Sequence, residues 1–267
     1  MNLQAAQRHV LSALFCAIIA TAPGAVQRVA AEDFRVETTI YVGEKEEPAS
    51  ANITRFKGSI VWDFAGDGSE IAMFDKPRGR FALLDLNRKV KTEVSMDEVL
   101  KFTQQLRDWA GGQDDPLLKF CAAPRLDATT GATPQTLKFT GTLLSYEIET
   151  QRPPQPEFAA RYRDFSDWYA RVNTLFRPGL LPPFPRLLVN EHLGREQLVP
   201  QRVKLTLAPQ RSNGNREVSV RSEQNFVYGL GESDIAAINR AAGFLVALPA
   251  VPLETYRQEE TAAAPKK

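Results

Sequence analysis

The sequence predicts an α+β fold with a single antiparallel, half-barrel-like β-sheet that amphipathic helices cover on one face. Three observations support this prediction. Apolar and polar residues alternate along several segments, which is the period of a half-buried strand. Two longer segments have one apolar stripe each at helical spacing. Strands and helices show little β-α-β alternation, which favours an antiparallel sheet.

The composition divides the chain into three parts. Residues 10–22 are an apolar run of the length of a signal-peptide core, and the small residues Val29 and Ala31 precede Glu32 as in a cleavage site. We therefore expect a signal peptide over residues 1–31, a single α+β domain over 32–253 and a disordered polar tail over 254–267.

A signal peptide implies an exported protein that is periplasmic or associated with the cell envelope. The apolar run is too short for a membrane span, so we expect no stable span after cleavage. The alternative is that the run is retained as an N-terminal anchor. Lipid attachment at Cys16 is disfavoured because the large residue Phe15 precedes the cysteine.

Charge and cysteine content exclude several functions. The formal net charge is +1, and no basic cluster is interleaved with aromatic residues, so we expect no nucleic-acid partner. Cleavage would remove Arg8 and Arg28 and no acidic residue, leaving 31 basic and 32 acidic residues. Only Cys121 of the two cysteines would remain, so no internal disulfide is expected.

The first half of the domain reads as strands. Residues 33–43 and 51–64 are predicted as two long strands, and residues 70–95 as a meander of three short strands. The sequences DKPRG and DLNRK separate the short strands as turns. The charged residues of these turns, among them Asp75, Arg80 and Asp85, are explained by the exposure of turns to solvent. The alternative is that they form a functional site.

Helices are predicted next. Residues 95–112 begin with a Ser95–Glu98 capping box, and their apolar stripe consists of Val99, Phe102, Leu106 and Trp109. Residues 157–176 have a longer stripe of the same kind, consisting of Phe158, Tyr162, Phe165, Tyr169, Val172 and Phe176.

The remaining segments complete the prediction. Residues 116–124 fit a short helix or a strand, and residues 137–150 fit a strand. Prolines make residues 177–188 a predicted apolar loop. Residues 199–209 and 215–231 are then expected to pair as strands, and residues 232–246 to form a last helix.

The sequence offers few groups for catalysis. Cleavage would leave one histidine, His192, and one cysteine, Cys121, which are a formal pair of base and nucleophile. A buried structural cysteine is the favoured interpretation of Cys121. The acidic residues of 63–70 miss the spacing of a calcium loop, and GLGESD lacks the lysine of a phosphate-binding loop. No metal or cofactor is therefore expected. A hydrolase that uses only Asp and Glu stays open as a third interpretation.

The turn-rich stretch has a resemblance to a known family. Residues 76–81 (KPRGRF) and 83–94 (LLDLNRKVKTEV) resemble the sheet of the outer-membrane lipoprotein carrier family, and periplasmic lipid-binding lipoproteins are similar in the same way. The resemblance implies an open antiparallel half-barrel, helices over its concave face and an apolar cavity for acyl chains. It also implies that Arg80 lies near the cavity wall. The alternative is another exported family that shares only the architecture.

These observations lead to a non-catalytic function in binding. We expect a hydrophobic ligand, such as an acyl chain or a lipid, between the sheet and the helices. The alternative is an exported interaction module with a solid core, whose apolar loop docks a partner such as an envelope protein. The expected ligand-binding residues are Arg80, Phe102, Trp109, Phe165, Trp168, Tyr169, Phe176, Leu181 and Phe184.

Overall fold

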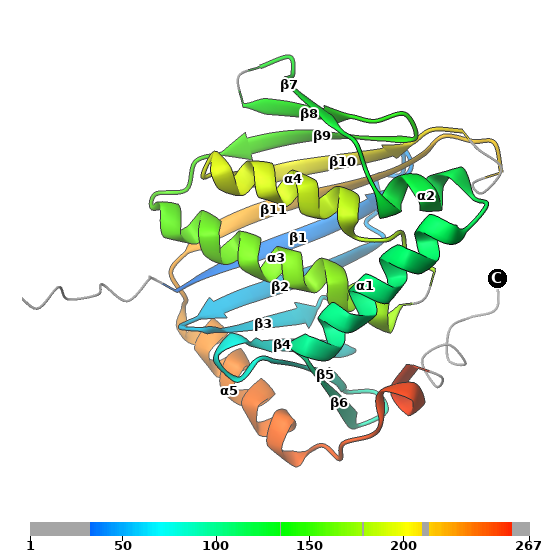
Figure 1. Ribbon diagram of the computed structural model, residues 1–267. Coiled ribbons are helices and arrows are strands. Elements are labelled where there is room, and N and C mark those ends of the chain that lie inside the picture. The colour runs from blue at the N-terminus through cyan, green and yellow to red at the C-terminus, as the bar shows by residue number, and fades with distance from the viewer. Residues whose placement is uncertain (1–32, 134, 178, 210–213, 258–267) are drawn as a thin grey trace, which may run out of the picture. The chain divides into compact units, whose positions relative to one another are not determined.

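An open antiparallel sheet of 11 strands forms the centre of the fold (Figure 1). The computed structural model describes residues 33–133, 135–177, 179–209 and 214–257. The strands are β1 (Phe34–Val42), β2 (Ser50–Lys57), β3 (Ile60–Ala65), β4 (Glu70–Asp75), β5 (Arg80–Asp85), β6 (Val90–Ser95), β7 (Asp127–Thr130), β8 (Thr136–Thr140), β9 (Leu144–Gln151), β10 (Val199–Leu207) and β11 (Val218–Tyr228). The predicted α+β class with one antiparallel sheet is confirmed.

Two meanders meet at β1. The strand order is β6-β5-β4-β3-β2-β1-β11-β10-β9-β8-β7, so β1 pairs with β2 on one side and with β11 on the other. The helices are α1 (Met96–Gly112), α2 (Pro116–Ala122), α3 (Pro156–Phe176), α4 (Phe184–Arg195) and α5 (Glu232–Ala247), with a 3-10 turn η1 (Lys76–Arg78). The predicted signal peptide, residues 1–31, lies outside the described residues.

Two segments predicted as single strands are hairpins. Residues 51–64 contain β2 and β3, joined by Gly58 and Ser59, with Lys57 paired to Ile60. Gly58 has a φ of +56°, which a two-residue hairpin needs at its first turn position. Residues 137–150 likewise contain β8 and β9, and the turn between them begins at Gly141.

The predicted apolar loop over residues 177–188 is partly helical. The helix α4 begins at Phe184, and Pro185 lies in its first turn. A proline there removes no helical hydrogen bond, since the first backbone N–H groups of a helix have no partner within it. The predicted loop is therefore wrong for residues 184–188, because a proline in the first turn of a helix does not break it.

Two turns of one kind flank β5. Asp75 accepts the backbone N–H of Arg78 at 3.3 Å and the Arg78 guanidinium at 2.9 Å. Asp85 accepts the same two groups of Arg88, both at 2.7 Å. Each aspartate therefore closes its own turn, and these local bonds account for the four charges in the way that the turn interpretation predicts.

Substitutions at the left-handed positions of these turns should change stability in opposite directions. Gly79 and the exposed Lys89 have φ angles of 61° and 57°. A side chain in that conformation costs about 1–2 kcal/mol, and the freedom of glycine in the unfolded chain offsets part of this. We expect Lys89→Gly to raise the free energy of unfolding by about 1 kcal/mol and Gly79→Ala to lower it by as much. Chemical denaturation measures both, and a less stable Lys89→Gly variant would contradict the prediction.

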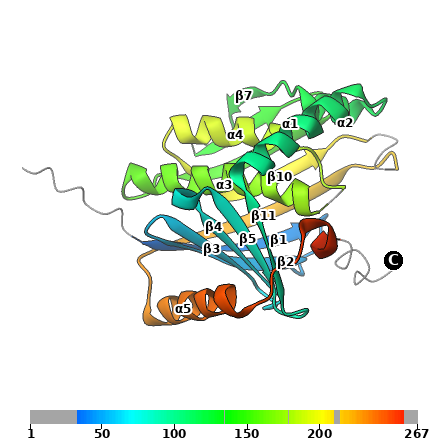
Figure 2. The ribbon, with the colours of Figure 1, turned by 60° about the horizontal axis from the view of Figure 1, so that its bottom comes forward.

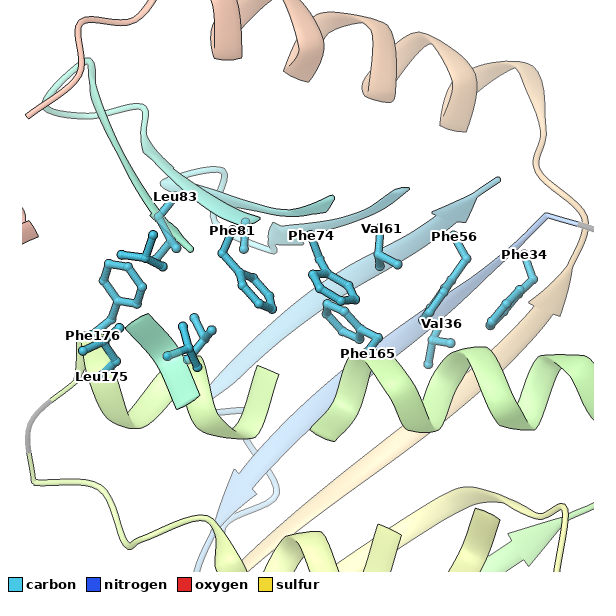
Figure 3. Packing of buried hydrophobic residues seen from close by; sticks show 14 of the residues in the cluster. Phe34, Val36, Phe56, Val61, Phe74, Phe81, Leu83, Phe165, Leu175 and Phe176 are labelled. Carbon is cyan, nitrogen blue, oxygen red and sulfur yellow. The ribbon is translucent and has the colours of Figure 1, made fainter. Parts of the chain in front are cut away.

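The larger core lies between the sheet and α3 (Figure 3). Phe34 and Phe56 stack with ring centroids 4.1 Å apart, and Phe74 and Phe81 stack at 4.6 Å. Phe165 of α3 meets Phe56 edge-on at 5.6 Å. A second core lies under α2 and α4, and its buried residues are Leu117, Cys121, Phe139, Leu144, Tyr146, Ile148, Val189, Leu193 and Val203.

Helices lie on both faces of the sheet, with α5 covering the second face at β3–β5, which corrects the prediction of helices on one face only. Figure 2 shows α5 on the side of the sheet opposite to α1, α3 and α4. Alternate residues of β5 serve the two sides: Phe81 and Leu83 belong to the core with α3, whereas Ala82 and Leu84 pack with Ile238 of α5. The strand is therefore apolar on both faces because both faces are covered.

The ordered domain extends past the predicted boundary at residue 253. Residues 253–257 are helical, and Tyr256 is fully buried, with its ring 5.9 Å from that of Phe176. The guanidinium of Arg88 lies over the ring of Tyr256 at 4.6 Å. The prediction of a disordered tail is therefore wrong for residues 254–257, and residues 258–267 lie outside the described part of the chain.

Candidate functional site

A cleft of about 510 Å³ lies beside α1 and is walled mainly by apolar side chains. We call it the α1 cleft. Its volume is in the range of small-molecule sites in proteins. Its lining residues are Phe102, Gln105, Leu106, Trp109, Leu118, Thr174, Gly179, Leu180, Leu181 and Arg257.

The position of α1 explains why this cleft is apolar. Val99, Thr103 and Ala110 are the buried side of the helix. Val99 is thus the one member of the predicted stripe on the buried side. The other three, Phe102, Leu106 and Trp109, lie on an adjacent side, which only partly contacts the rest of the domain, and they face the cleft. Most of the stripe therefore forms a wall of the cleft and does not pack on the sheet.

Two apolar side chains at the cleft are half exposed. Trp109 is 52% exposed and Leu180 is 50% exposed. Leu180 follows Gly179, whose φ of +98° turns the chain after the end of α3. Large apolar side chains that gather around a hollow at the surface are typical of a binding site.

Three of the nine predicted site residues line the α1 cleft: Phe102, Trp109 and Leu181. The other seven lining residues were not among the predicted site residues: Gln105, Leu106, Leu118, Thr174, Gly179, Leu180 and Arg257. Leu180 had a signal, since it belongs to the apolar run GLLPPFP, whereas nothing in the sequence connects Arg257 to α1.

Four other predicted residues, all on α3, belong to the sheet–helix core. Phe165 and Phe176 are buried members of it, and Trp168 and Tyr169 pack against it. The ring of Trp168 lies 6.3 Å from those of Phe74 and Phe81. These rings fill the space in which the sequence analysis expected the ligand, so the structure does not place these residues around the α1 cleft.

Tyr169 has a polar partner beneath α3. Its hydroxyl donates to Asp63 at 2.9 Å, and Thr54 donates to the other carboxylate oxygen at 2.6 Å. Burial, reinforced by the Asp63 charge, raises the pKa of Tyr169 well above its ordinary value. The phenol therefore stays protonated at neutral pH and fastens α3 to β3.

Arg80 lies away from the core that contains α3. It precedes Phe81 on β5, and adjacent residues of a strand point to opposite faces. Its guanidinium contacts Glu93 at 2.6 Å and Asp75 at 3.5 Å. The expected place of Arg80 at the wall of a cavity under the helices is therefore wrong.

Phe184 lines a different cleft, on the side of α4. The residue is buried, and the guanidinium of Arg107 lies over its ring at 4.1 Å. The two residues contribute to the wall of a hollow of about 610 Å³ between α1, α3 and α4.

Cys121 is not poised as a nucleophile. It is fully buried, and burial raises the pKa of its thiol to about 12, with a smaller contribution from Asp115. The reactive species of cysteine is the thiolate, which is scarce at neutral pH in such a site. His192 lies edge-on to Phe139 at 5.1 Å.

Within residues 33–133, 135–177, 179–209 and 214–257, no group of three or more His, Cys, Asp or Glu side chains is arranged to hold a metal ion. In that same part of the chain, no helix combines the length and apolar character that crossing a membrane requires.

Comparison with models of known protein families finds no match for this chain. A search of curated proteins finds no match either.

Proposed function

We propose that this protein binds a hydrophobic ligand, an acyl chain or a molecule that contains one, in the α1 cleft. The observation that supports the proposal is the pair of half-exposed side chains, Trp109 and Leu180, beside an apolar hollow. Burying each CH₂ group of a chain would contribute about 0.8 kcal/mol. A ligand that covered the two side chains would also remove their own apolar surface from water.

The architecture is compatible with the family resemblance. An open antiparallel sheet with α1, α3 and α4 over one face is the plan that the resemblance to lipoprotein carriers implies. The proposed site differs in its place: it lies beside α1, and the rings between the sheet and α3 pack against one another. Under this proposal the protein is exported, and it shields an apolar chain within the cell envelope.

The proposal is tested by ligand binding to two surface variants. We expect Trp109→Ser and Leu180→Ser each to weaken the binding of palmitate about threefold to tenfold, since full burial of an apolar side chain contributes about 1.5–3 kcal/mol and a ligand can cover only the exposed half of each. Both side chains are half exposed, so the free energy of unfolding should change by less than about 1 kcal/mol. Native mass spectrometry and titration with palmitate measure the binding.

The matched control is Val246→Ser. Val246 is 85% exposed at the end of α5, on the other face of the sheet. Equal binding by wild type, Trp109→Ser and Leu180→Ser would contradict the proposed site, and so would an equal loss in Val246→Ser. If purified wild type neither contains nor takes up lipid, docking of a partner protein becomes the better explanation of the exposed pair.

A further inference from the structure

A second hollow, which we call the arginine cleft, gathers positive charge. It has a volume of about 610 Å³ and is bounded by α1, α3, α4 and the segment that follows α2. Four arginines line it: Arg107 of α1 and Arg125 of that segment, which are exposed, and Arg163 and Arg171 of α3, which are partly buried. Figure 1 shows these elements side by side on one face of the sheet.

The carboxylates of the arginine cleft do not neutralise this charge. Two line it, Asp167 and Glu191, so four guanidinium groups against two carboxylates leave a formal +2. Asp167 already accepts Asn190 at 2.8 Å and lies 3.5 Å from Arg163. Glu191 is exposed, and its ion-pair contact is with Arg195 outside the cleft, at 3.9 Å.

Two of the arginines have no carboxylate partner. Within the described part of the chain, neither Arg107 nor Arg125 lies within ion-pair distance of an acidic side chain. Arg107 instead stacks on Phe184, which holds the charge at the cleft wall. Uncompensated charges in a hollow attract a counter-ion more strongly than the same charges on a flat surface.

Arg171 is partly desolvated in this cluster. Its guanidinium donates to the backbone carbonyl of Asp167 at 2.6 Å and lies over the ring of Trp168 at 5.5 Å. Burial lowers the pKa of Arg171, Asp167 opposes that effect, and the like charge of Arg107 lowers the pKa further. A bound anion would relieve this repulsion between Arg107 and Arg171.

We infer that the arginine cleft binds a phosphate group, either as a monoester or as a diester. Guanidinium groups present planar forks of donors that match the oxygens of phosphate, and several of them can share one anion. Leu187 and Leu188 complete the wall, with Leu188 partly exposed, so the phosphate can belong to a molecule with an aliphatic part. The inference goes beyond the proposed function and does not depend on the α1 cleft.

The same chemistry can come from a lipid headgroup or from a soluble phosphate. The full chain is therefore titrated with inorganic phosphate, and separately sedimented with vesicles of phosphatidylglycerol or of phosphatidylcholine. The test variant is Arg107→Gln/Arg125→Gln, which removes the two arginines without acidic partners. The control is Arg216→Gln/Arg240→Gln, which makes the same change of charge at two exposed arginines outside the cleft.

We expect wild type and the control to bind saturably, and the test variant to bind about tenfold more weakly or worse. Binding of inorganic phosphate assigns the site to a soluble phosphate, and binding of phosphatidylglycerol vesicles alone assigns it to a headgroup. If wild type binds neither inorganic phosphate nor phosphatidylglycerol vesicles, the inference is overturned. Undiminished binding by the test variant overturns it as well. An equal loss in the control overturns it too, because the cause would then be net charge.

Discussion

Replacing Asp234 by asparagine is expected to destabilise the protein by about 3–5 kcal/mol, because it breaks a buried ion pair and leaves an arginine without its counter-charge. Asp234 lies in the first turn of α5 and is only 2% exposed. Its carboxylate accepts Arg55 and Arg35, each at 2.8 Å, and the backbone N–H of Gly231 at 3.1 Å. The two arginine bonds fasten α5 to β1 and β2, and the bond from Gly231 caps the start of α5.

The pH dependence of this destabilisation shows whether it comes from the lost ion pair or from the changed shape of the side chain. Burial alone raises the pKa of Asp234, but the bonds from Arg55, Gly231 and Arg35 outweigh it, so the pKa is lowered. A lowered pKa in the folded state means a stabilisation that is present above the unfolded pKa, which is about 3.9, and is lost as the pH falls below it. The difference between wild type and Asp234→Asn should therefore be full at pH 7 and shrink toward pH 3.

Chemical denaturation at several pH values measures this difference, with Glu37→Gln as the control. Glu37 contacts the same Arg35 at 3.0 Å but is 39% exposed, so its loss should cost less than about 1 kcal/mol. If Asp234→Asn also costs less than about 1 kcal/mol, the prediction is wrong. Desolvation of the buried charges would then offset their attraction.

The strand and helix periods of the sequence predicted most of the fold. Ser95 and Glu98 form the expected capping box, with the Ser95 N–H donating to Glu98 at 2.8 Å and the Glu98 N–H donating to Ser95 at 3.2 Å. The missed hairpin at Gly58 had a local signal, since glycine followed by serine suits a two-residue turn. The apolar alternation continues across that turn, which is why the segment reads as one strand.

The two-sided packing of β5 depends on an element far along the chain. Ala82 and Leu84 are apolar, but the sequence of β5 does not show that α5, more than 140 residues later, covers them. Which helix packs on the opposite face of a sheet depends on tertiary contacts, and local periodicity contains no information about those contacts.

The site was only partly predictable for a related reason. The stripe on α1 and the stripe on α3 have the same helical spacing, yet Phe165 is buried and Trp109 is half exposed. The difference is that α3 lies directly over the aromatic residues of β1, β2, β4 and β5, whereas α1 turns its buried side, around Val99 and Thr103, toward the domain. Spacing identifies an apolar face, but only packing decides whether that face is core or cleft.

The second large effect is expected at Phe165 and distinguishes core from ligand site. Phe165→Ala should lower the free energy of unfolding by about 3–5 kcal/mol, the usual cost of a buried phenylalanine. The ring lies 5.6 Å from Phe56, 6.4 Å from Phe74 and 5.1 Å from Tyr169, so its removal opens a void that those rings cannot readily close. A folded domain of this size has about 5–15 kcal/mol of stability, so the variant should still fold.

Palmitate affinity then decides which cavity the ligand uses. If the α1 cleft is the site, folded Phe165→Ala should bind palmitate as wild type does, while Trp109→Ser should differ from wild type by less than about 1 kcal/mol in stability but bind more weakly. Denaturation curves and palmitate titrations on the two variants therefore give opposite patterns. The reverse outcome, a stable Phe165→Ala that has lost its ligand, would return the binding site to the space between α3 and the sheet, where the sequence alone had placed it.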